Sequence, residues 1–452
     1  MPALTRQTSF SLSRSDFPDD FKFGTSTSAY QIEGSKFGGA GSSHWDTFAT
    51  SPGNVVNFEN GSIACDHYHK WQGDLDLMRD LGIDSYRFSS SWARVMPEGK
   101  GAVNAEGLDF YDRLVDGLLE RNIEPHLTLY HWELPSALSD LGGWQNRDIA
   151  DHFADYAEIM ITRMGDRLES VATFNEPWCI TWLSHYHGIH APGLRDIRAA
   201  TRASHHVLLS HAKAVAILRS MEQKNLGIVL NFEHTTPFDD QESSIEAARI
   251  AEGIYNRWFL GGLFKGAYPE DVVTYLEPYL PTGWQDDMAA INAPLDWLGI
   301  NYYTRNLVVE KEPCEGCTLP NFTSEPGPLP KTEMNWEVYP QGLSALLRWI
   351  SETHTGALPL TVTENGMAND DHLIDGEVDD QERIAYLDMH FKAALEVIED
   401  GVPLTGYFVW SFMDNFEWAL GYDKRFGIIH VDFDTLERLP KASYHAFKAF
   451  LA

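Results

Sequence analysis

Short apolar runs and longer amphipathic stretches alternate repeatedly along this 452-residue chain. Eight runs rich in apolar or β-branched residues end in polar residues, at 21–25, 85–88, 125–129, 171–174, 227–231, 297–301, 360–363 and 405–410. Between them, apolar residues recur at the three- and four-residue spacing of helices, as in 108–119. Candidate functional residues end nearly every run. In a doubly wound sheet they would instead be expected at the one point where the strand order reverses. The pattern therefore predicts an α/β fold, a (β/α)8 TIM barrel.

The chain shows no break that would divide it into separate domains. We expect one barrel domain over residues 1–452, with residues 1–15 loosely ordered. The segment 312–331, rich in Pro, Gly and Cys, is expected to be a long loop after the sixth strand. Loops that follow barrel strands surround the site in folds of this kind, so this loop is expected to form part of the rim.

Two short motifs place a carboxylate just beyond separate apolar runs. Glu176 stands in Thr-Phe-Asn-Glu-Pro-Trp (173–178), and Glu364 stands in Thr-Val-Thr-Glu-Asn-Gly (361–366). One such glutamate would more often be a solvated loop residue or a helix cap. Two of them at strand ends of one barrel converge on the same face. A facing pair of carboxyls is what cleavage of a glycosidic bond needs, so the motifs predict a glycosidase.

The charge balance is strongly acidic. The chain carries 66 acidic and 34 basic side chains, a net charge of −32 and a pI near 4.8. Such a surface repels nucleic acid and anionic membranes, so we expect neither as a partner. It also disfavours a strongly anionic substrate.

The four cysteines, Cys65, Cys179, Cys314 and Cys317, are too few and too scattered for a disulfide scaffold, and reduced thiols are expected. Cys314 and Cys317 have the spacing of half a zinc site, but no second pair lies near them, so no metal is expected there. No apolar run is long enough to span a membrane, and the first residues lack the apolar core of a signal peptide. We therefore expect a cytoplasmic protein.

Further motif blocks stand in order along the chain, at 21–34, 86–92, 130–135, 298–303, 410–418 and 425–429. Together with the two carboxylate motifs, they resemble glycoside hydrolase family 1, the β-glucosidase and β-galactosidase family, over nearly the whole chain. The resemblance implies that Glu176 is the acid/base and Glu364 the nucleophile of a retaining double displacement. It implies that Arg87 and Tyr303 hold the nucleophile and that Asn175 binds the sugar 2-hydroxyl.

The resemblance also implies a sugar pocket. The reaction that it implies needs no cofactor. Gln31, His131, Glu417 and Trp418 match residues that contact sugar hydroxyls, and Trp410 matches a stacking platform. Asn301 is expected to support the polar shell, and Trp336 and Trp178 match positions near the leaving group. In the loop after the fourth strand, Leu183 and His185 are expected to narrow the entrance.

Two positions restrict the substrate. Glu417 would repel a 6-phosphate, which favours an unphosphorylated sugar, and Glu176 stands where plant thioglucosidases carry Gln, which favours an O-glycoside. The expected partners are small β-glycosides or cello-oligosaccharides with a terminal β-D-glucosyl, galactosyl or fucosyl residue, as in cellulose degradation.

Two other classes of protein stay open from the sequence. A metal-dependent barrel hydrolase would use imidazole ligands, for which the candidates are His67, His69, His185, His187 and His190. A noncatalytic sugar-binding protein could share the same barrel, although it would have no need to keep both glutamates.

Overall fold

A computed structural model describes residues 8–312 and 319–452, and in this part of the chain eight parallel strands form a closed barrel. The barrel strands are β1 (Lys22–Ser26), β2 (Ser85–Ser89), β3 (Glu124–Tyr130), β4 (Ser170–Asn175), β5 (Leu226–Pro237), β6 (Trp297–Glu310), β8 (Leu360–Asn365) and β9 (Leu404–Trp410). They follow one another around the ring in chain order, and the pairing of β9 with β1 closes it. Each of the eight predicted runs overlaps one of these strands, so the predicted (β/α)8 barrel is confirmed.

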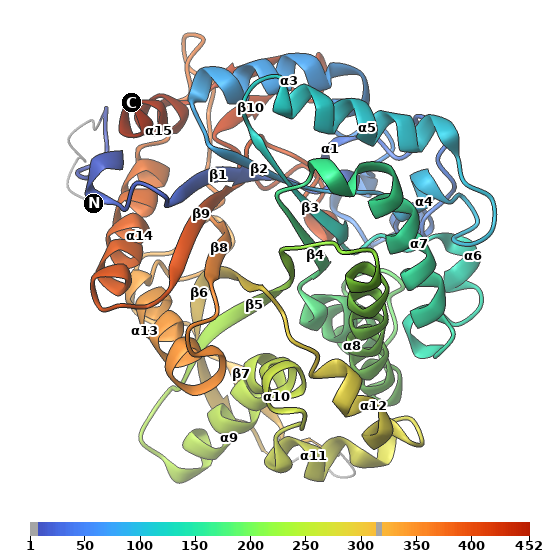
Figure 1. Ribbon diagram of the computed structural model, residues 1–452. Helices are drawn as coiled ribbons and strands as arrows, with labels where there is room; N and C mark the ends of the chain where they lie inside the picture. The colour runs from blue at the N-terminus through green and yellow to red at the C-terminus, as the bar shows by residue number, and fades with distance from the viewer. Residues whose placement is uncertain (1–7, 313–318) are drawn as a thin grey trace.

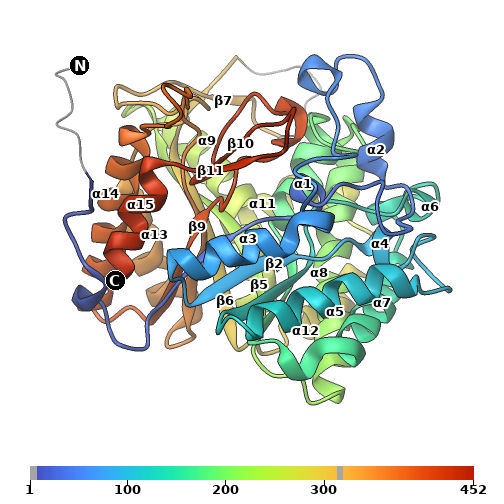
Figure 2. The same cartoon turned by 90° about the horizontal axis from the view of Figure 1, so that it is seen from above.

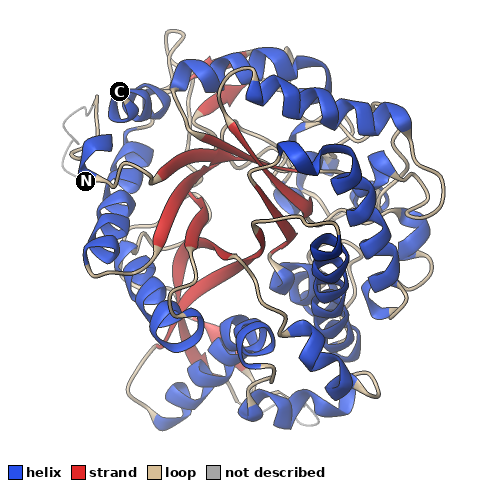
Figure 3. Cartoon of the chain, viewed as in Figure 1, coloured by secondary structure: helices blue, strands red, loops and turns tan. Residues whose placement is uncertain are grey.

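Helices surround the barrel on its outside, and shorter ones lie in the rim loops (Figures 1 and 3). They are α1 (Ala29–Ile32), α2 (His44–Ala49), α3 (His67–Leu81), α4 (Trp92–Val95), α5 (Ala105–Leu119), α6 (Ser136–Ser139), α7 (Ile149–Met164), α8 (Ile197–Ser220), α9 (Glu242–Glu252), α10 (Trp258–Lys265), α11 (Glu270–Leu276), α12 (Trp284–Ile291), α13 (Pro340–Ile350), α14 (Gln381–Glu399) and α15 (Ala442–Leu451). Helix α5 contains the predicted amphipathic stretch and buries Phe110, Leu114 and Leu118. These residues repeat every four positions, so they lie on the face toward the strands.

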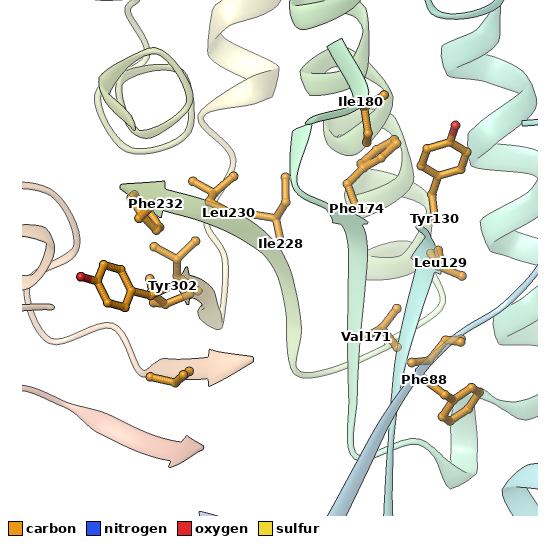
Figure 4. Close-up of a cluster of buried hydrophobic side chains, with 14 of the residues drawn as sticks. Phe88, Leu129, Tyr130, Val171, Phe174, Ile180, Ile228, Leu230, Phe232 and Tyr302 are labelled. Atoms are coloured by element: carbon orange, nitrogen blue, oxygen red, sulfur yellow. The ribbon is translucent and has the colours of Figure 1, made fainter. Parts of the chain in front are cut away.

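Apolar side chains fill the layer between the strands and the surrounding helices (Figure 4). Phe174 of β4 packs against Tyr130 of β3, with 5.6 Å between ring centroids, and against Phe153 of α7, at 4.4 Å. Ile228 and Leu230 of β5 are buried in the same layer. Burial of each such side chain stabilises the fold by about 1.5–3 kcal/mol, which ties the helices to the barrel.

The segment after the sixth barrel strand differs in part from the expected loop. Strand β6 continues beyond the barrel to Glu310, and the short strand β7 (Phe322–Ser324) pairs antiparallel with this extension. The reason is that the extension would otherwise expose an unpaired backbone edge, which β7 covers. Within the described residues, Cys65 and Cys179 are free thiols, as expected, whereas Cys314 and Cys317 lie outside the described residues.

The first described residues lie against the C-terminal helix α15 (Figure 2). Residues 1–7 of the segment expected to be loosely ordered lie outside the described residues. The described part of the segment packs against the outer helices: Phe10 is buried against Phe391 of α14 and Phe450 of α15, and Ser11 donates its backbone N–H to Asp388 of α14 at 2.7 Å.

The rim at the carboxyl ends of the strands is built from the longer connections. The loop after β1 contains α1 and α2, and the chain after β9 forms the hairpin of β10 (Ile429–Val431) and β11 (Arg438–Pro440). Across residues 8–312 and 319–452, we find no helix with both the length and the apolarity needed to cross a lipid bilayer.

Candidate active site

Glu176 and Glu364 both face one cavity of about 700 Å3 at the carboxyl ends of the strands. Glu176 directly follows β4, and Glu364 lies near the end of β8. Glu176 adopts a left-handed backbone conformation, with φ of 52°, which is uncommon for a residue with a side chain. Its N–H donates to the carbonyl oxygen of Val229 on β5 at 2.9 Å, so the neighbouring strand holds this conformation.

Irregular strand pairing turns the site residues toward the barrel interior. Side chains alternate between the two faces of a regular strand, so Ala172 and Asn175 would face opposite sides. The register of β4 with β5 shifts between them. On β8, the adjacent residues Thr363 and Glu364 both face the interior, and the pairing of β8 with β9 shifts around them. Irregularities of this kind aim side chains and are frequent next to active sites.

Glu364 has charged and polar partners on both oxygens. Arg87 Nη1 donates to Oε1 at 2.7 Å, and the Tyr303 hydroxyl donates to Oε2 at 2.7 Å. Burial raises the pKa of Glu364, while the charge of Arg87 and these two hydrogen bonds act against that rise. Because Arg87 contacts Glu364 and not Glu176, Glu364 is the carboxyl of the pair that ionises first.

Glu176 has no cation among its hydrogen-bond partners in the described chain. Asn301 Nδ2 donates to Oε1 at 2.7 Å, and Cys179 Sγ lies 3.0 Å from Oε2. Burial and then the negative charge of Glu364 raise the pKa of Glu176 to about 8. Glu176 is therefore the carboxyl of the pair that keeps its proton to higher pH, which is the division of roles that a proton donor and a nucleophile need.

A continuous set of hydrogen bonds joins the two glutamates. Arg87 Nη2 donates to Asn175 Oδ1 at 2.7 Å, and Asn301 Nδ2 donates to the same oxygen at 3.0 Å. Asn175 Nδ2 then donates to His131 Nε2 at 3.1 Å. Burial lowers the pKa of His131 well below its usual value, so this ring is neutral.

The structure brings the predicted site residues to one place. The cavity is lined by His131, Asn301, Tyr303, Trp336, Trp410, Glu417 and Trp418 together with the two glutamates. Three further predicted residues do not line the cavity but bond residues that do: Arg87 bonds Glu364, Asn175 bonds His131, and Gln31 bonds Glu417.

Near-parallel aromatic rings form one wall of the cavity. His131 lies 5.8 Å from Trp410 and 6.0 Å from Trp418, with interplanar angles of 18° and 13°. Trp418 is backed by Tyr30, at 5.8 Å and 8°. Flat apolar surfaces with polar edges suit a pyranose, whose faces carry C–H groups and whose edge carries hydroxyls.

Glu417 is a third acid at this cavity. Gln31 Nε2 donates to Asn415 Oδ1 at 2.8 Å, to the Phe416 carbonyl oxygen at 3.0 Å and, more weakly, to Glu417 Oε2 at 3.4 Å. Burial, followed by the charges of Glu364 and Glu176, raises the pKa of Glu417 to about 8. A neutral carboxyl here can both donate to and accept from sugar hydroxyls.

Three residues of the site were missed by the sequence analysis. Cys179 bonds Glu176, Trp132 donates from Nε1 to the Asn175 carbonyl oxygen at 3.0 Å, and Glu233 of β5 faces the cavity. Cys179 follows Glu176 by three residues, and this helical spacing was a usable signal. Burial raises the pKa of Glu233 to about 7, and nothing in the local sequence indicated this.

The outer part of the cavity only partly matches the expectation. Trp178 and Leu183 line it, and the Trp178 ring lies 4.2 Å from the ring of Tyr255. His185 instead is buried and bonds the Ile180 carbonyl oxygen at 3.1 Å, within the π-helical turn Cys179–His187. His185 therefore contributes to the shape of the turn and not to the cavity wall.

The histidines considered as metal ligands fall into two separate segments, helix α3 and residues 185–190. His67 pairs with Asp74 at 2.8 Å and His69 with Asp66 at 2.5 Å, both on α3 and away from the cavity. His190 lines the cavity. In the described part of the chain, no three His, Cys, Asp or Glu side chains gather in a metal-binding group.

The chain is similar to known proteins over nearly its full length. A family model described as Glycosyl hydrolase family 1 matches residues 13–452. The chain is 46% identical to β-glucosidase A of Thermotoga maritima over 431 residues, which cover 94% of this chain and 96% of that one. It is 40% identical to a bifunctional β-D-glucosidase/β-D-fucosidase of Bifidobacterium breve, covering 96% and 98% of the two chains.

Solved structures agree with these similarities. The family 1 β-glucosidase from Thermotoga maritima in complex with isofagomine lactam superposes with a TM-score of 0.93. It is 44% identical, and the match covers 96% of this chain and 98% of the other.

Proposed function

The chain belongs to glycosyl hydrolase family 1, which confirms the resemblance of its motif blocks, and we propose that it is a retaining β-glucosidase. It removes terminal non-reducing β-D-glucosyl residues from small β-glycosides or cello-oligosaccharides. The main support is that two buried carboxyls in one cavity differ in their contacts. Among the described residues, Glu364 contacts a cation, whereas Glu176 contacts none and has its pKa raised to about 8.

The reaction has two steps with opposite proton transfers. In the first, the Glu364 carboxylate attacks the anomeric carbon, and Glu176 gives its proton to the departing glycosidic oxygen. In the second, the Glu176 carboxylate takes a proton from water, and the resulting hydroxide displaces Glu364 from the sugar. Arg87 and Tyr303 hold Glu364 in place for attack and for release.

The sugar occupies the inner part of the cavity. Glu417 and Trp418 hold hydroxyls, with Gln31 behind Glu417 and Trp410 as the stacking surface. His131 contributes a polar contact next to the anomeric centre with Asn175 behind it, and Asn301 positions Glu176. The relative crystallised with isofagomine lactam supports a sugar-sized ligand in this fold.

Sugar selectivity is expected to be broad. The relative from Bifidobacterium breve is named for both β-D-glucosidase and β-D-fucosidase activity, which supports turnover of fucosides as well as glucosides here. The net charge of −32 favours neutral glycosides as partners over nucleic acid or anionic surfaces.

The first experiment is turnover of aryl β-glucoside, β-galactoside, β-fucoside and cellobiose, followed by analysis of the product anomer. We expect turnover with initial release of β-glucose. Sugar binding without turnover would favour a noncatalytic binding protein, and loss of turnover on chelation would favour the metal-dependent hydrolase.

Azide separates the roles of the two glutamates. With Glu176→Ala and a dinitrophenyl β-glucoside, Glu364 still forms the covalent intermediate, and azide should intercept it to give the β-glycosyl azide. With Glu364→Ala, azide should attack the substrate directly and give the α-glycosyl azide. The same anomer from both variants would contradict the assignment.

A further inference from the structure

The two oxygens of Glu176 have partners of different chemical kinds. Oε1 accepts from the amide nitrogen of Asn301 at 2.7 Å, and Oε2 lies 3.0 Å from the sulfur of Cys179. An amide nitrogen only donates, whereas a thiol has both an S–H hydrogen and acceptor lone pairs. A residue that alternates between acid and carboxylate in each turnover needs a partner that suits both states.

The direction of the Asn301 amide follows from Arg87, because a guanidinium can only donate. Arg87 Nη2 lies 2.7 Å from Asn175, so the Asn175 atom facing it is the oxygen. Asn301 bonds that same oxygen at 3.0 Å and must present its nitrogen, which is also the atom bonded to Glu176 Oε1. The Asn301 oxygen then accepts from the Thr363 hydroxyl at 2.7 Å.

Oε1 therefore faces a fixed donor, which favours it as the carbonyl oxygen of the neutral carboxyl group. The proton is left for Oε2, on the side of Cys179. Asn231 Nδ2 of β5 donates toward the Cys179 sulfur at 3.6 Å and holds it in place. Burial raises the pKa of the Cys179 thiol well above its usual value, so the sulfur keeps its own hydrogen and can donate it.

We propose that Oε2 of Glu176 carries the catalytic proton and that Cys179 is a positioning residue that serves both protonation states of this oxygen. This inference rests on the proposed function. In the neutral state the S–H hydrogen points away from Oε2. When the Oε2 proton passes to the leaving glycosidic oxygen, the thiol turns and donates to the new carboxylate. When water returns a proton to Oε2, the thiol turns back.

Other titratable groups also face this pair. They are Glu364 on β8, Arg87 on β2, Tyr303 on β6, Glu233 on β5, Tyr255 beside Asn231, and Glu417 on the rim. Substitution of Cys179 leaves all of them in place, so a change in the pH profile reports on the thiol contact itself.

The test is the pH dependence of kcat/KM for Cys179→Ala and Cys179→Ser. Without the S–H donor the Glu176 carboxylate is less stable, so in Cys179→Ala the basic limb should move up by about half a unit to one unit. Cys179→Ser keeps a donor and acceptor, so its basic limb should stay in place or move down. At neutral pH, Cys179→Ala should lose more kcat/KM on cellobiose than on a dinitrophenyl glucoside, whose leaving group needs no proton.

Cys65→Ala is the matched control, because Cys65 is also buried but bonds the Asp414 carbonyl oxygen at 3.1 Å and does not line the cavity. Infrared spectroscopy gives a second readout: the Cys179 S–H stretch, absent in Cys179→Ala and kept in Cys65→Ala, should shift to lower frequency as pH rises through the basic limb. An unchanged basic limb in Cys179→Ala, or an S–H band indifferent to pH, would overturn the proposal. Absence of β-glucosidase activity in the unmodified protein would instead overturn the proposed function.

Discussion

Two buried clusters of acidic side chains in this molecule are built in opposite ways. In the site cluster, Glu176, Glu364 and Glu417 face one cavity, and of these three acids Arg87 bonds only Glu364. Within the described residues, neither Glu176 nor Glu417 has a Lys or Arg partner. The pKa values of Glu176 and Glu417 rise to about 8 because burial and the neighbouring carboxylates disfavour their charged forms.

The second cluster, which we name the C-terminal ionic cluster, consists of Asp371, Asp380 and Asp414 with Arg383, Arg425 and Lys441. It joins the segment after β8 to α14 and to the start of α15. Burial alone would raise the pKa of Asp371, but the charges of Arg383 and Lys441 outweigh it and lower this pKa to about 2. Asp380 keeps a raised pKa, because burial outweighs the charge of Arg383 there.

The ratio of cationic to acidic side chains therefore decides what a buried acidic cluster can do. Where cations match the acids, the group fixes parts of the chain to each other, and loss of one member leaves an unpaired charge. Where cations are too few, carboxyls hold protons at neutral pH and can give them to a substrate.

Glu176→Gln should abolish proton donation without weakening the fold. We expect kcat/KM for cellobiose to fall by about 10²- to 10⁴-fold, the usual contribution of a general acid. The free energy of unfolding at pH 7.5 should stay the same or rise, because the variant removes an acid that lacks a cation. Steady-state kinetics and urea unfolding measure the two effects, and a marked loss of stability would contradict the comparison.

Arg383→Met should have the reverse outcome. The Arg383 side chain is 1% exposed and bonds Asp371 and Asp380, so its removal leaves two buried acids with fewer partners. We expect a loss of about 3–5 kcal/mol in the free energy of unfolding, while kcat/KM of the folded protein stays unchanged. Arg163→Met is the control: Arg163 pairs with Asp109 and Asp112 in water, and its loss should cost less than about 1 kcal/mol.

Within the site cluster, Glu417→Ala should cost far more turnover than loss of an outer aromatic residue. Glu417 is proposed to hold sugar hydroxyls whose binding strengthens in the transition state, so kcat/KM on a small glucoside should fall by roughly 100-fold or more. Trp336→Ala, which removes a ring 5.4 Å from Tyr303, should cost less than roughly tenfold. If Trp336→Ala is the more damaging change on a small glucoside, the inner and outer parts of the cavity are assigned the wrong way round.

The barrel and the two candidate carboxyls could be predicted from the sequence because both leave local signals. Apolar runs that end in polar residues mark strands, and Glu176 and Glu364 each stand at the end of such a run. The sugar-pocket residues came from the resemblance to a family, since a lone His131 or Trp418 has no local signal that separates a binding residue from a core residue.

Other features depend on contacts that a single sequence does not display. The register shifts in β4 and β8, which turn Asn175 and Glu364 inward, depend on the neighbouring strands. The C-terminal ionic cluster joins residues as far apart as Asp371 and Lys441. The pattern for 312–331 gave only a loop, because the pairing of β7 requires the extension of β6 as a partner.

The smallest effect predicted is in the pH dependence of stability, where the two clusters should have opposite signs. The pKa of Glu417 is about 8 in the folded protein and near 4.5 when unfolded, so the native state binds more protons between these values and loses stability as pH rises. Glu417→Gln should remove this contribution. The stability of the variant relative to the unmodified protein should therefore increase by on the order of 1–2 kcal/mol from pH 5 to pH 7.5, a figure reduced from the full effect because water reaches Glu417 through the cavity.

Asp371, whose pKa falls from 3.8 to about 2, contributes stability that is present above pH 3.8 and lost as pH falls toward 2. Asp371→Asn should therefore cost most at neutral pH and least near pH 2, and thermal unfolding of both variants across pH measures the two trends. Parallel trends in the two variants would mean that cation matching does not separate the clusters.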